Sequence, residues 1–123
     1  MSKAIRFHKA GGPEVLVYEN VEVGSPGPGQ ARVRNKVIGL NFIDTYHRSG
    51  LYPLPLPHGV GMEASGIVEA VGGGVTAVSP GDRVAYCAGP PGAYSEERLI
   101  AADRLVKLPN GVLDEEAAAM MLK

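Results

Sequence analysis

The sequence is poor in cysteine, in net charge and in long uncharged runs, and each shortage excludes a class of protein. Its single cysteine, Cys87, rules out an internal disulfide and fits a reducing compartment. Twelve basic and 13 acidic residues leave a net charge of −1, which gives no electrostatic reason to expect a nucleic-acid or membrane partner. Prolines interrupt the longest uncharged run, and the first residues lack the apolar core of a signal peptide. We therefore expect a soluble, cytoplasmic protein.

Glycine and proline, by contrast, are plentiful. The 123 residues amount to one domain's worth of chain, and they include 17 glycines and 10 prolines. These residues lie between runs in which apolar and polar side chains alternate. That arrangement is typical of a turn-rich β domain and not of a disordered chain.

The stretch 61–74 alternates most clearly. Ala64, Gly66, Val68 and Ala70 share one face, and larger or polar side chains occupy the other. A period of two over this length predicts a strand with one packed face. Gly66 in the middle of that strand indicates that another backbone or a ligand passes close to it.

Two segments, 59–64 and 72–77, match the loose dinucleotide fingerprint Gly-x-Gly-x-x-Gly/Ala. The fingerprint indicates phosphate binding only where a strand precedes it and a helix opens from it. The first match runs into the alternating stretch, and the second runs into a turn at 79–82. We therefore interpret both as turn glycines, and the chain carries no dinucleotide cradle of its own.

One short helix is predicted over residues 42–49. Asn41 suits the N-cap and Gly50 suits the position after the last turn. Asp44 and Arg48 have the spacing of a helical ion pair, which is worth about 0.2–0.5 kcal/mol if it is exposed.

Six further segments read as short strands separated by turns. Repeated short strands with one small helix predict a mainly β fold in the form of a closed or partly closed β-barrel. On one of these strands Arg32, Arg34 and Lys36 share a face, which we interpret as its solvated side and not as a phosphate site. The segments are 3–8, 15–23, 31–37, 83–87, 93–100 and 104–108.

The last ten residues change character. Asp114 suits an N-cap, glutamates fill the first turn and strong helix formers follow, but no Gly, Asn or Pro ends the helix before Lys123. An isolated helix of this size is shorter than the roughly 12–15 residues at which such helices become marginal. We expect it to be frayed, or ordered only by packing of its apolar side chains on another chain. Those side chains are Ala117, Met120, Met121 and Leu122.

Several of these segments together carry a family resemblance. They are 39–50, 61–66 with Gly72, 80–84 and 92–94. From Ile5 to Lys123 the sequence resembles the N-terminal half of zinc-independent NADPH:quinone oxidoreductases, the zeta-crystallin-like branch of the medium-chain dehydrogenase/reductases. The resemblance implies a GroES-like, partly closed β-barrel catalytic domain over residues 1–113. It also implies that residues 114–123 begin a connecting C-terminal helix, which leads to a Rossmann nucleotide-binding domain that this sequence does not include.

The same resemblance implies the reaction and its partners. The whole protein would transfer a hydride from NADPH to a quinone or another electron-poor small molecule. NADPH would be bound mainly by the downstream domain, and the whole protein would be a homo-oligomer. On that interpretation the present chain is a domain fragment that is inactive by itself.

The metal question can be argued from two positions. In the zinc-dependent branch of the superfamily a cysteine stands where Asn41 is and a histidine where Met62 is. An amide and a thioether are poor zinc ligands beside a thiolate and an imidazole. The remaining candidate ligands have no ligand spacing: they are His8, His47, His58 and Cys87. We therefore expect a metal-free site and a hydride acceptor that needs no Lewis acid.

The resemblance places Asn41, Tyr46 and Tyr52 at the cofactor-facing cleft, as catalytic residues, with Asn41 and Tyr46 also touching the cofactor. An amide offers a donor and an acceptor, and a tyrosine combines a flat apolar face with a hydroxyl, which suits a quinone slot. The structural alternatives are that Asn41 is only an N-cap, Tyr46 a core residue and Tyr52 a loop residue packed on prolines.

Three neighbouring residues have simpler interpretations. Glu63 either orients the adjacent loop or is an acid at a surface-exposed strand start. Met62 suits core filling, because a flexible thioether fits irregular gaps. Cys87 has no nearby base in the sequence and is interpreted as an inert, small apolar residue.

Two other functions remain open on the sequence. A 2-enoyl reductase of the same superfamily would share the cleft and reduce a conjugated C=C bond instead of a quinone. A free-standing GroES-like binding or assembly module would share the fold alone. The module requires a long mobile apolar loop, but three prolines stiffen the longest candidate, 51–60.

The purified chain is expected to contain no zinc after dialysis, because Asn41 and Met62 occupy the ligand positions. Elemental analysis by mass spectrometry tests this expectation. One zinc ion per chain that survives dialysis would contradict it.

Overall fold

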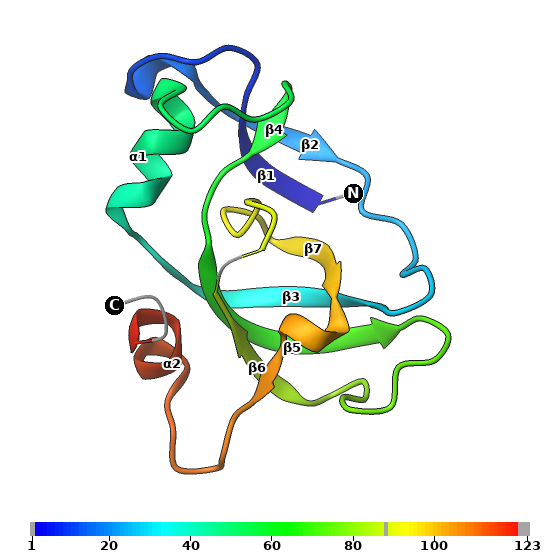
Figure 1. Ribbon diagram of the computed structural model, residues 1–123. Coiled ribbons are helices and arrows are strands. Elements are labelled where there is room, and N and C mark those ends of the chain that lie inside the picture. Colours follow the sequence, from blue (N-terminus) through cyan, green and yellow to red (C-terminus); the bar gives the residue numbers. More distant parts are fainter. Residues whose placement is uncertain (1, 88, 121–123) are drawn as a thin grey trace.

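The computed structural model describes residues 2–87 and 89–120, and within these ranges the chain folds into two β-sheets with helices at their margins (Figure 1). The elements in chain order are β1 (Ser2–Phe7), the 3-10 helix η1 (Pro13–Val15), β2 (Leu16–Val21), β3 (Gln30–Gly39), α1 (Phe42–Ser49), β4 (His58–Gly59), β5 (Glu63–Val71), β6 (Arg83–Tyr86), β7 (Glu97–Ala101), the 3-10 helix η2 (Ala102–Arg104), β8 (Val106–Lys107) and α2 (Asp114–Met120).

The two sheets meet along one edge without closing into a single barrel. The smaller sheet has the order β2-β1-β4, and the larger has the order β7-β3-β5-β6-β8. An isolated bridge between Ala4 and Ser95 connects them, and the Ile5 N–H donates to the Tyr94 carbonyl at 2.8 Å. The expected mainly β class is correct, and the barrel is only partly closed.

The alternating stretch forms β5, the central strand of the larger sheet. Ala64 and Val68 on its packed face are fully buried, together with Val33 of β3 and Val84 of β6. The sequence-based prediction of a strand with one packed face is confirmed. A second, smaller cluster of Phe7, Val15 and Val60 lies under the smaller sheet, and the Tyr94 ring packs against it.

Two glycines of the central stretch stand where another backbone passes. A Cβ added at Gly66 would lie 2.1 Å from the Arg34 carbonyl oxygen, and one added at Gly72 would lie 1.8 Å from that of Gly27. Neighbouring backbone, and not a ligand, therefore requires both glycines. The two fingerprint matches also lack a following helix, since Ala64 lies in β5 and 72–77 is irregular.

Some element boundaries differ from those predicted. Residues 93–96 are a loop, and β7 begins only at Glu97. The loop bonds to β1 of the smaller sheet, through Tyr94 to Ile5 and through Glu96 to Lys3, and the Asn35 amide donates to the carbonyl oxygens of Ala93 and Ser95. The segment 104–108 contributes only the two-residue strand β8, since Arg104 belongs to η2.

Two of the basic side chains on one face of β3, Arg32 and Arg34, form ion pairs. Arg32 and Arg34 donate to Glu69 of β5 at 3.3 and 2.9 Å. Glu97 of β7 lies within 3.8 and 3.5 Å of the same two guanidiniums. These partly exposed pairs fit the interpretation of a solvated strand face.

The C-terminal helix corrects an expectation. α2 is ordered over Asp114–Met120 and packs on β5, β3 and β6 of its own chain, so the described part is neither frayed nor dependent on another chain. Ala117 and Ala118 are each 1% exposed, and the Ser65 hydroxyl donates to the Asp114 carbonyl at 2.8 Å. Tertiary packing supplies the stability that the helix lacks alone. The expected contacts of Met121 and Leu122 lie outside the described residues.

Within the same ranges, every helix is too short, or too polar, to span a lipid bilayer.

The close approach at Gly72 predicts an asymmetric pair of substitutions. Gly72→Ala should lower the free energy of unfolding by about 1–3 kcal/mol, because the added Cβ forces the Gly27 carbonyl to move. Gly73→Ala is the matched control, since nothing lies within 4 Å of its added Cβ, and it should change stability by less than about 0.5 kcal/mol. Urea denaturation of the two variants measures the difference. Equal effects would contradict the backbone contact.

Candidate functional site

Local chemistry sets both ends of α1. Asn41 has the extended backbone of an N-cap, and its N–H donates to the Asp44 carboxylate at 3.1 Å. Gly50 adopts a left-handed conformation, with φ of 87°, where the helix ends. The predicted helix and both predicted caps are confirmed.

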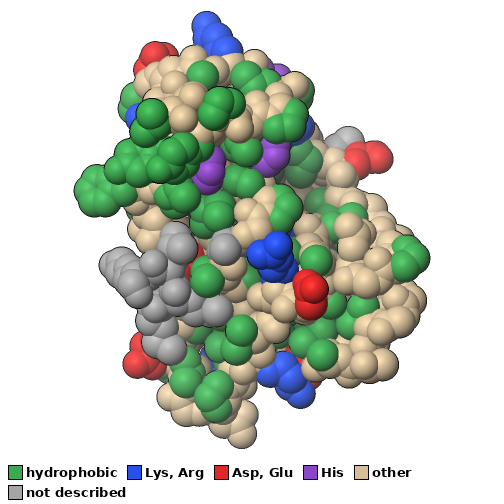
Figure 2. Space-filling model, in the orientation of Figure 1, with side chains coloured by type: hydrophobic (Ala, Val, Ile, Leu, Met, Phe, Trp, Pro, Cys, Tyr) green, Lys and Arg blue, Asp and Glu red, His purple; other side chains and the backbone are tan. Residues whose placement is uncertain are grey.

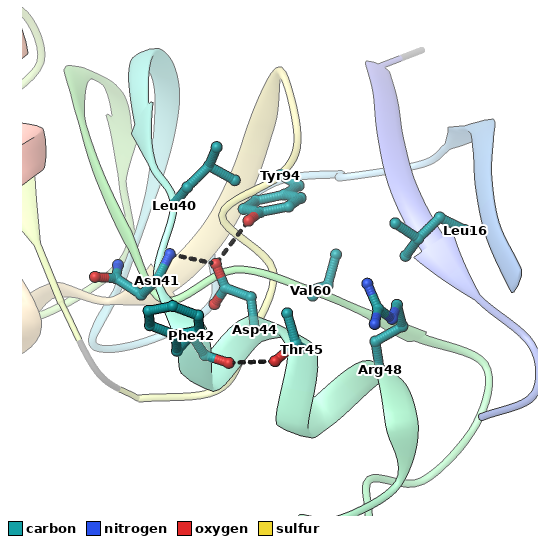
Figure 3. Close-up of a pocket in the computed structure, with 9 residues that line it drawn as sticks. All are labelled: Leu16, Leu40, Asn41, Phe42, Asp44, Thr45, Arg48, Val60 and Tyr94. Atoms are coloured by element: carbon teal, nitrogen blue, oxygen red, sulfur yellow. Dashed lines mark hydrogen bonds between the residues drawn. The ribbon is translucent and has the colours of Figure 1, made fainter. Parts of the chain in front are cut away.

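A buried hydrogen bond fixes α1 to the rest of the domain. The Tyr94 hydroxyl donates to Asp44 Oδ2 at 2.6 Å, and Asp44 is only 5% exposed (Figure 3). Burial, and then the hydrogen bond to the Asp44 carboxylate, raise the pKa of Tyr94 well above its ordinary value. Asp44 Oδ1 is also buried and has no partner among the described residues.

The expected ion pair between Asp44 and Arg48 does not form. Asp44 faces the interior, where Tyr94 reaches it, whereas the Arg48 guanidinium donates to the Gly11 carbonyl at 3.3 Å. Helical spacing predicted the pair, but tertiary partners take both side chains.

A second buried carboxylate orients the Asn41 side chain. Asn41 Nδ2 donates to Glu63 Oε1 at 3.1 Å, and Glu63, at the start of β5, is 1% exposed. The interpretation of Glu63 as a surface acid is therefore wrong. The Asn41 amide points away from Asp44 and Tyr94 (Figure 3), so Asn41 does more than cap the helix.

Tyr46 and Tyr52 form an exposed aromatic pair. Their ring centroids are 5.6 Å apart with the planes at 76°, an edge-to-face contact. The Tyr52 N–H donates to the Tyr46 carbonyl at 3.2 Å. Tyr46 is 39% exposed, so it is not a core residue, and Tyr52 is 50% exposed. Asn41 lies five residues before Tyr46, about 7–8 Å along the helix axis.

Large apolar side chains are exposed on and around this helix. Phe42 is 83% exposed and Leu40 is 76% exposed, values far from those of a core. Figure 2 shows hydrophobic side chains gathered over the part of the molecule that carries α1, with histidines beside them. An apolar surface of this kind marks a ligand or protein contact. The exposed apolar residues of this region are Leu40, Phe42, Tyr46, Leu51, Tyr52 and Leu56.

His47 lies buried beside the tyrosine pair. Its ring centroid is 6.1 Å from that of Tyr52, and the residue is 7% exposed. Nδ1 is buried and has no hydrogen-bond partner among residues 2–87 and 89–120, and burial lowers the pKa of His47. Sequence reasoning gave this residue no role. Its signal was present, because Asp44 and His47 place two polar side chains on one helix face.

A pocket of about 570 Å³ opens on the other side of α1. Asn41 is the one predicted site residue that lines it, while Tyr46 and Tyr52 stand outside it on the exposed surface. The structure thus brings the two tyrosines together and keeps Asn41 separate at the helix start. The lining residues are Leu16, Leu40, Asn41, Phe42, Asp44, Thr45, Arg48, Val60 and Tyr94 (Figure 3).

The two positions that bear on zinc are well defined. Asn41 bonds to Glu63, and Met62 is buried, as its interpretation as core filling predicts. No three His, Cys, Asp or Glu side chains gather closely enough to hold a metal ion within 2–87 and 89–120.

Residues 27–110, which include the whole of the larger sheet and of α1, match the family of the alcohol dehydrogenase GroES-like domain. The chain belongs to this family.

The chain is also similar, over its whole length, to individual curated proteins. Over its whole length the chain is 59% identical to a quinone oxidoreductase of Pseudomonas aeruginosa, of which it covers 38%. It is 52% identical, again over its whole length, to a 2-haloacrylate reductase of a Burkholderia species and covers 39% of that protein. The chain thus spans less than half the length of these relatives.

Solved structures agree with the sequence relatives. A quinone oxidoreductase of Pseudomonas syringae pv. tomato matches with a TM-score of 0.97 at 58% identity, over 99% of this chain and 38% of that one. The Escherichia coli quinone oxidoreductase complexed with NADPH matches with a TM-score of 0.94 at 50% identity, over 99% and 37%. The predicted GroES-like fold is confirmed.

Removal of the Tyr94 hydroxyl should destabilise the domain. Tyr94→Phe removes the hydroxyl donor of the buried Asp44 carboxylate, which keeps only the Asn41 N–H among the donors described, and should cost about 1.5–3 kcal/mol. Tyr18→Phe is the control, since Tyr18 is 66% exposed. Urea denaturation at pH 7 measures both.

The pH dependence of the free energy of unfolding provides a second test with Tyr94→Phe. Because the folded pKa of Tyr94 is raised, its stabilising effect is complete below its ordinary value of 10 and is lost as pH rises above it. The difference between wild type and Tyr94→Phe should therefore shrink at alkaline pH. A constant difference would contradict the buried hydroxyl.

Proposed function

We propose that this chain is the GroES-like catalytic domain of a zinc-independent, NADPH-dependent quinone reductase. One observation carries the proposal. A buried carboxylate orients the Asn41 amide at one end of an exposed helix that carries an aromatic pair at the other end. The chain that forms this arrangement is 59% identical, over its whole length, to a quinone oxidoreductase.

The proposal includes a division of labour between domains. Residues 1–113 form the catalytic domain, and residues 114–123 begin the helix that leads to a Rossmann nucleotide-binding domain. The 38% coverage of the relatives supports this division. So do the two glycine motifs, which lack the strand-turn-helix setting that holds a pyrophosphate. The whole protein is proposed to be cytoplasmic and homo-oligomeric.

Each site residue has a positioning role. NADPH, when bound, supplies the hydride for the reaction. The Asn41 amide, held by Glu63, hydrogen-bonds the nicotinamide or the carbonyl of the acceptor. Tyr46 and Tyr52 offer ring faces to a flat acceptor and hydroxyls to its oxygens. The apolar residues around them exclude water from the reacting atoms.

The acceptor has a second candidate. The 52% identity to a 2-haloacrylate reductase favours a small conjugated C=C substrate for the same site. Both acceptors are electron-poor and take a hydride without a Lewis acid, so the domain would serve either. The flat aromatic rings of the tyrosine pair favour the quinone. A free-standing binding module has less support, because these relatives are named as redox enzymes.

The acceptor is tested in a longer protein that continues this chain over the length of its relatives. NADPH consumption is followed with a benzoquinone and, separately, with 2-chloroacrylate. Faster turnover of the quinone supports the proposal, and faster turnover of the acrylate supports the second candidate. Equal turnover by the 123-residue chain alone would contradict the division of labour.

Substitutions at the site should reduce turnover in that longer protein. Asn41→Ala and Tyr46→Ala each remove one positioning contact, worth about 1–3 kcal/mol, and should lower kcat/KM by roughly 5- to 150-fold. Tyr18→Ala, on β2, is the control for loss of an exposed tyrosine and should leave kcat/KM unchanged. Wild-type kinetics combined with lower thermal stability would instead support a purely structural role for both residues.

A further inference from the structure

The rings of His47, Tyr52 and Tyr46 contact one another in that order. His47 contacts Tyr52 edge to face at 6.1 Å and 62°, and Tyr52 contacts Tyr46 at 5.6 Å and 76°. His47 is 7% exposed, whereas Tyr52 is 50% and Tyr46 is 39% exposed. The imidazole is therefore the buried support against which the outer rings rest.

Two buried polar atoms without partners lie on neighbouring positions of α1. His47 Nδ1 and Asp44 Oδ1 are both inaccessible, and neither has a hydrogen bond within the described part of the chain. Residues three apart are neighbours on a helix surface. The other oxygen of Asp44 is already engaged by Tyr94 and by the Asn41 backbone. A buried ring nitrogen and a buried carboxylate oxygen thus remain unmatched on neighbouring positions of the helix.

We propose that His47 is a positioning residue for the tyrosine pair: the neutral imidazole holds Tyr52 against Tyr46, and protonation turns the imidazole toward Asp44 and releases Tyr52.

The physical reason is the number of donors on the ring. A neutral imidazole carries one N–H, whereas an imidazolium carries two, and each buried N–H needs an acceptor. A buried donor left unsatisfied costs about 1–3 kcal/mol, and more when it is charged. Asp44 Oδ1 is the unmatched acceptor on the same helix. A ring that turns to reach it withdraws from Tyr52, which is half exposed and also contacts Tyr46.

The charged and titratable groups around His47 set the direction of the switch. Burial lowers the pKa of His47, Asp44 on its own helix raises it, and His58 of β4 lowers it, with a net lowering from 6.5. Arg48, the next residue, is turned away toward the Gly11 carbonyl. The imidazole is therefore neutral at neutral pH, and the released state is reached on acidification. Since the folded state takes up the proton less readily, this group also lowers stability as pH falls below 6.5.

The inference rests on the proposed function only for its kinetic consequence. The structural part concerns this chain alone and is tested on it by NMR titration of the His47 and Tyr52 ring protons. Both sets of resonances should shift with one common midpoint below 6.5, and the Tyr46 ring should follow. His47→Phe keeps an aromatic support but cannot be protonated, so it should abolish the Tyr52 transition. A Tyr52 transition that persists in His47→Phe, or that has its own midpoint, would overturn the inference.

Two further variants, at the charged neighbours of His47, should shift the common midpoint in opposite directions. Asp44→Asn removes the charge that favours the imidazolium and should move the common midpoint to lower pH. His58→Gln removes a repelling group and should move it to higher pH. His58 lies outside α1, so this variant gives the test even where Asp44→Asn unfolds. Movement of the His47 midpoint without the Tyr52 midpoint in either variant would contradict the coupling.

Kinetics of the longer protein separate this inference from the proposed function. In wild type, kcat/KM for the acceptor should fall on acidification with the midpoint of the ring transition, and in His47→Phe that acid limb should disappear. Activity without the acid limb in wild type would overturn the inference and leave the reductase intact. Absence of activity, together with the common NMR midpoint, would overturn the function and leave the switch intact.

Discussion

The hydrogen bond between Tyr94 and Asp44 is the contact on which the arrangement of the site depends. Asp44 belongs to the first turn of α1, and Tyr94 belongs to the loop that joins the two sheets. The Tyr94 backbone also bonds to Ile5 and Val60, and its ring fills the space that a side chain at Gly61 would need. One residue thus ties together the smaller sheet, the approach to β5 and the helix. Because Asp44 is buried, loss of the Tyr94 hydroxyl would leave its carboxylate with the Asn41 N–H as the one donor described, so this hydrogen bond favours a single position of the helix.

Buried carboxylates recur at this site for a related reason. Glu63 begins β5 inside the domain and bonds to the Asn41 amide, just as Asp44 holds Tyr94. A charge taken out of water needs specific donors, and those donors then lose their freedom to rotate. The domain therefore fixes the Asn41 amide and the helix through two buried carboxylates. This arrangement pre-organises the exposed face before any partner arrives.

Local chemistry made some parts of the structure predictable. The helix 42–49 follows from Asn41 and Gly50, and the packed face of β5 follows from its alternation. The parts that were mispredicted depend on distant partners. Asp44 pairs with Tyr94, 50 residues away, and not with Arg48 one turn along. α2 is too short to be stable alone, yet it packs because Ala117 and Ala118 fit against the sheet. A pattern in one sequence shows which residues are neighbours within one helix or strand. It does not show which residues of another helix or strand they contact.

The site also has an exposed apolar face, which differs from its buried polar contacts. Within the described residues, Glu63 holds the Asn41 amide and the rings of Tyr46 and Tyr52 contact each other, whereas both tyrosines, with Phe42 and Leu40, are exposed. If this face met only solvent, polar side chains would suit it better than these large apolar ones. Their presence indicates that the face is completed by something apolar or aromatic. The planar acceptor that we propose would satisfy that requirement, because it would cover the tyrosine rings on one side and need only a few polar groups for its orientation.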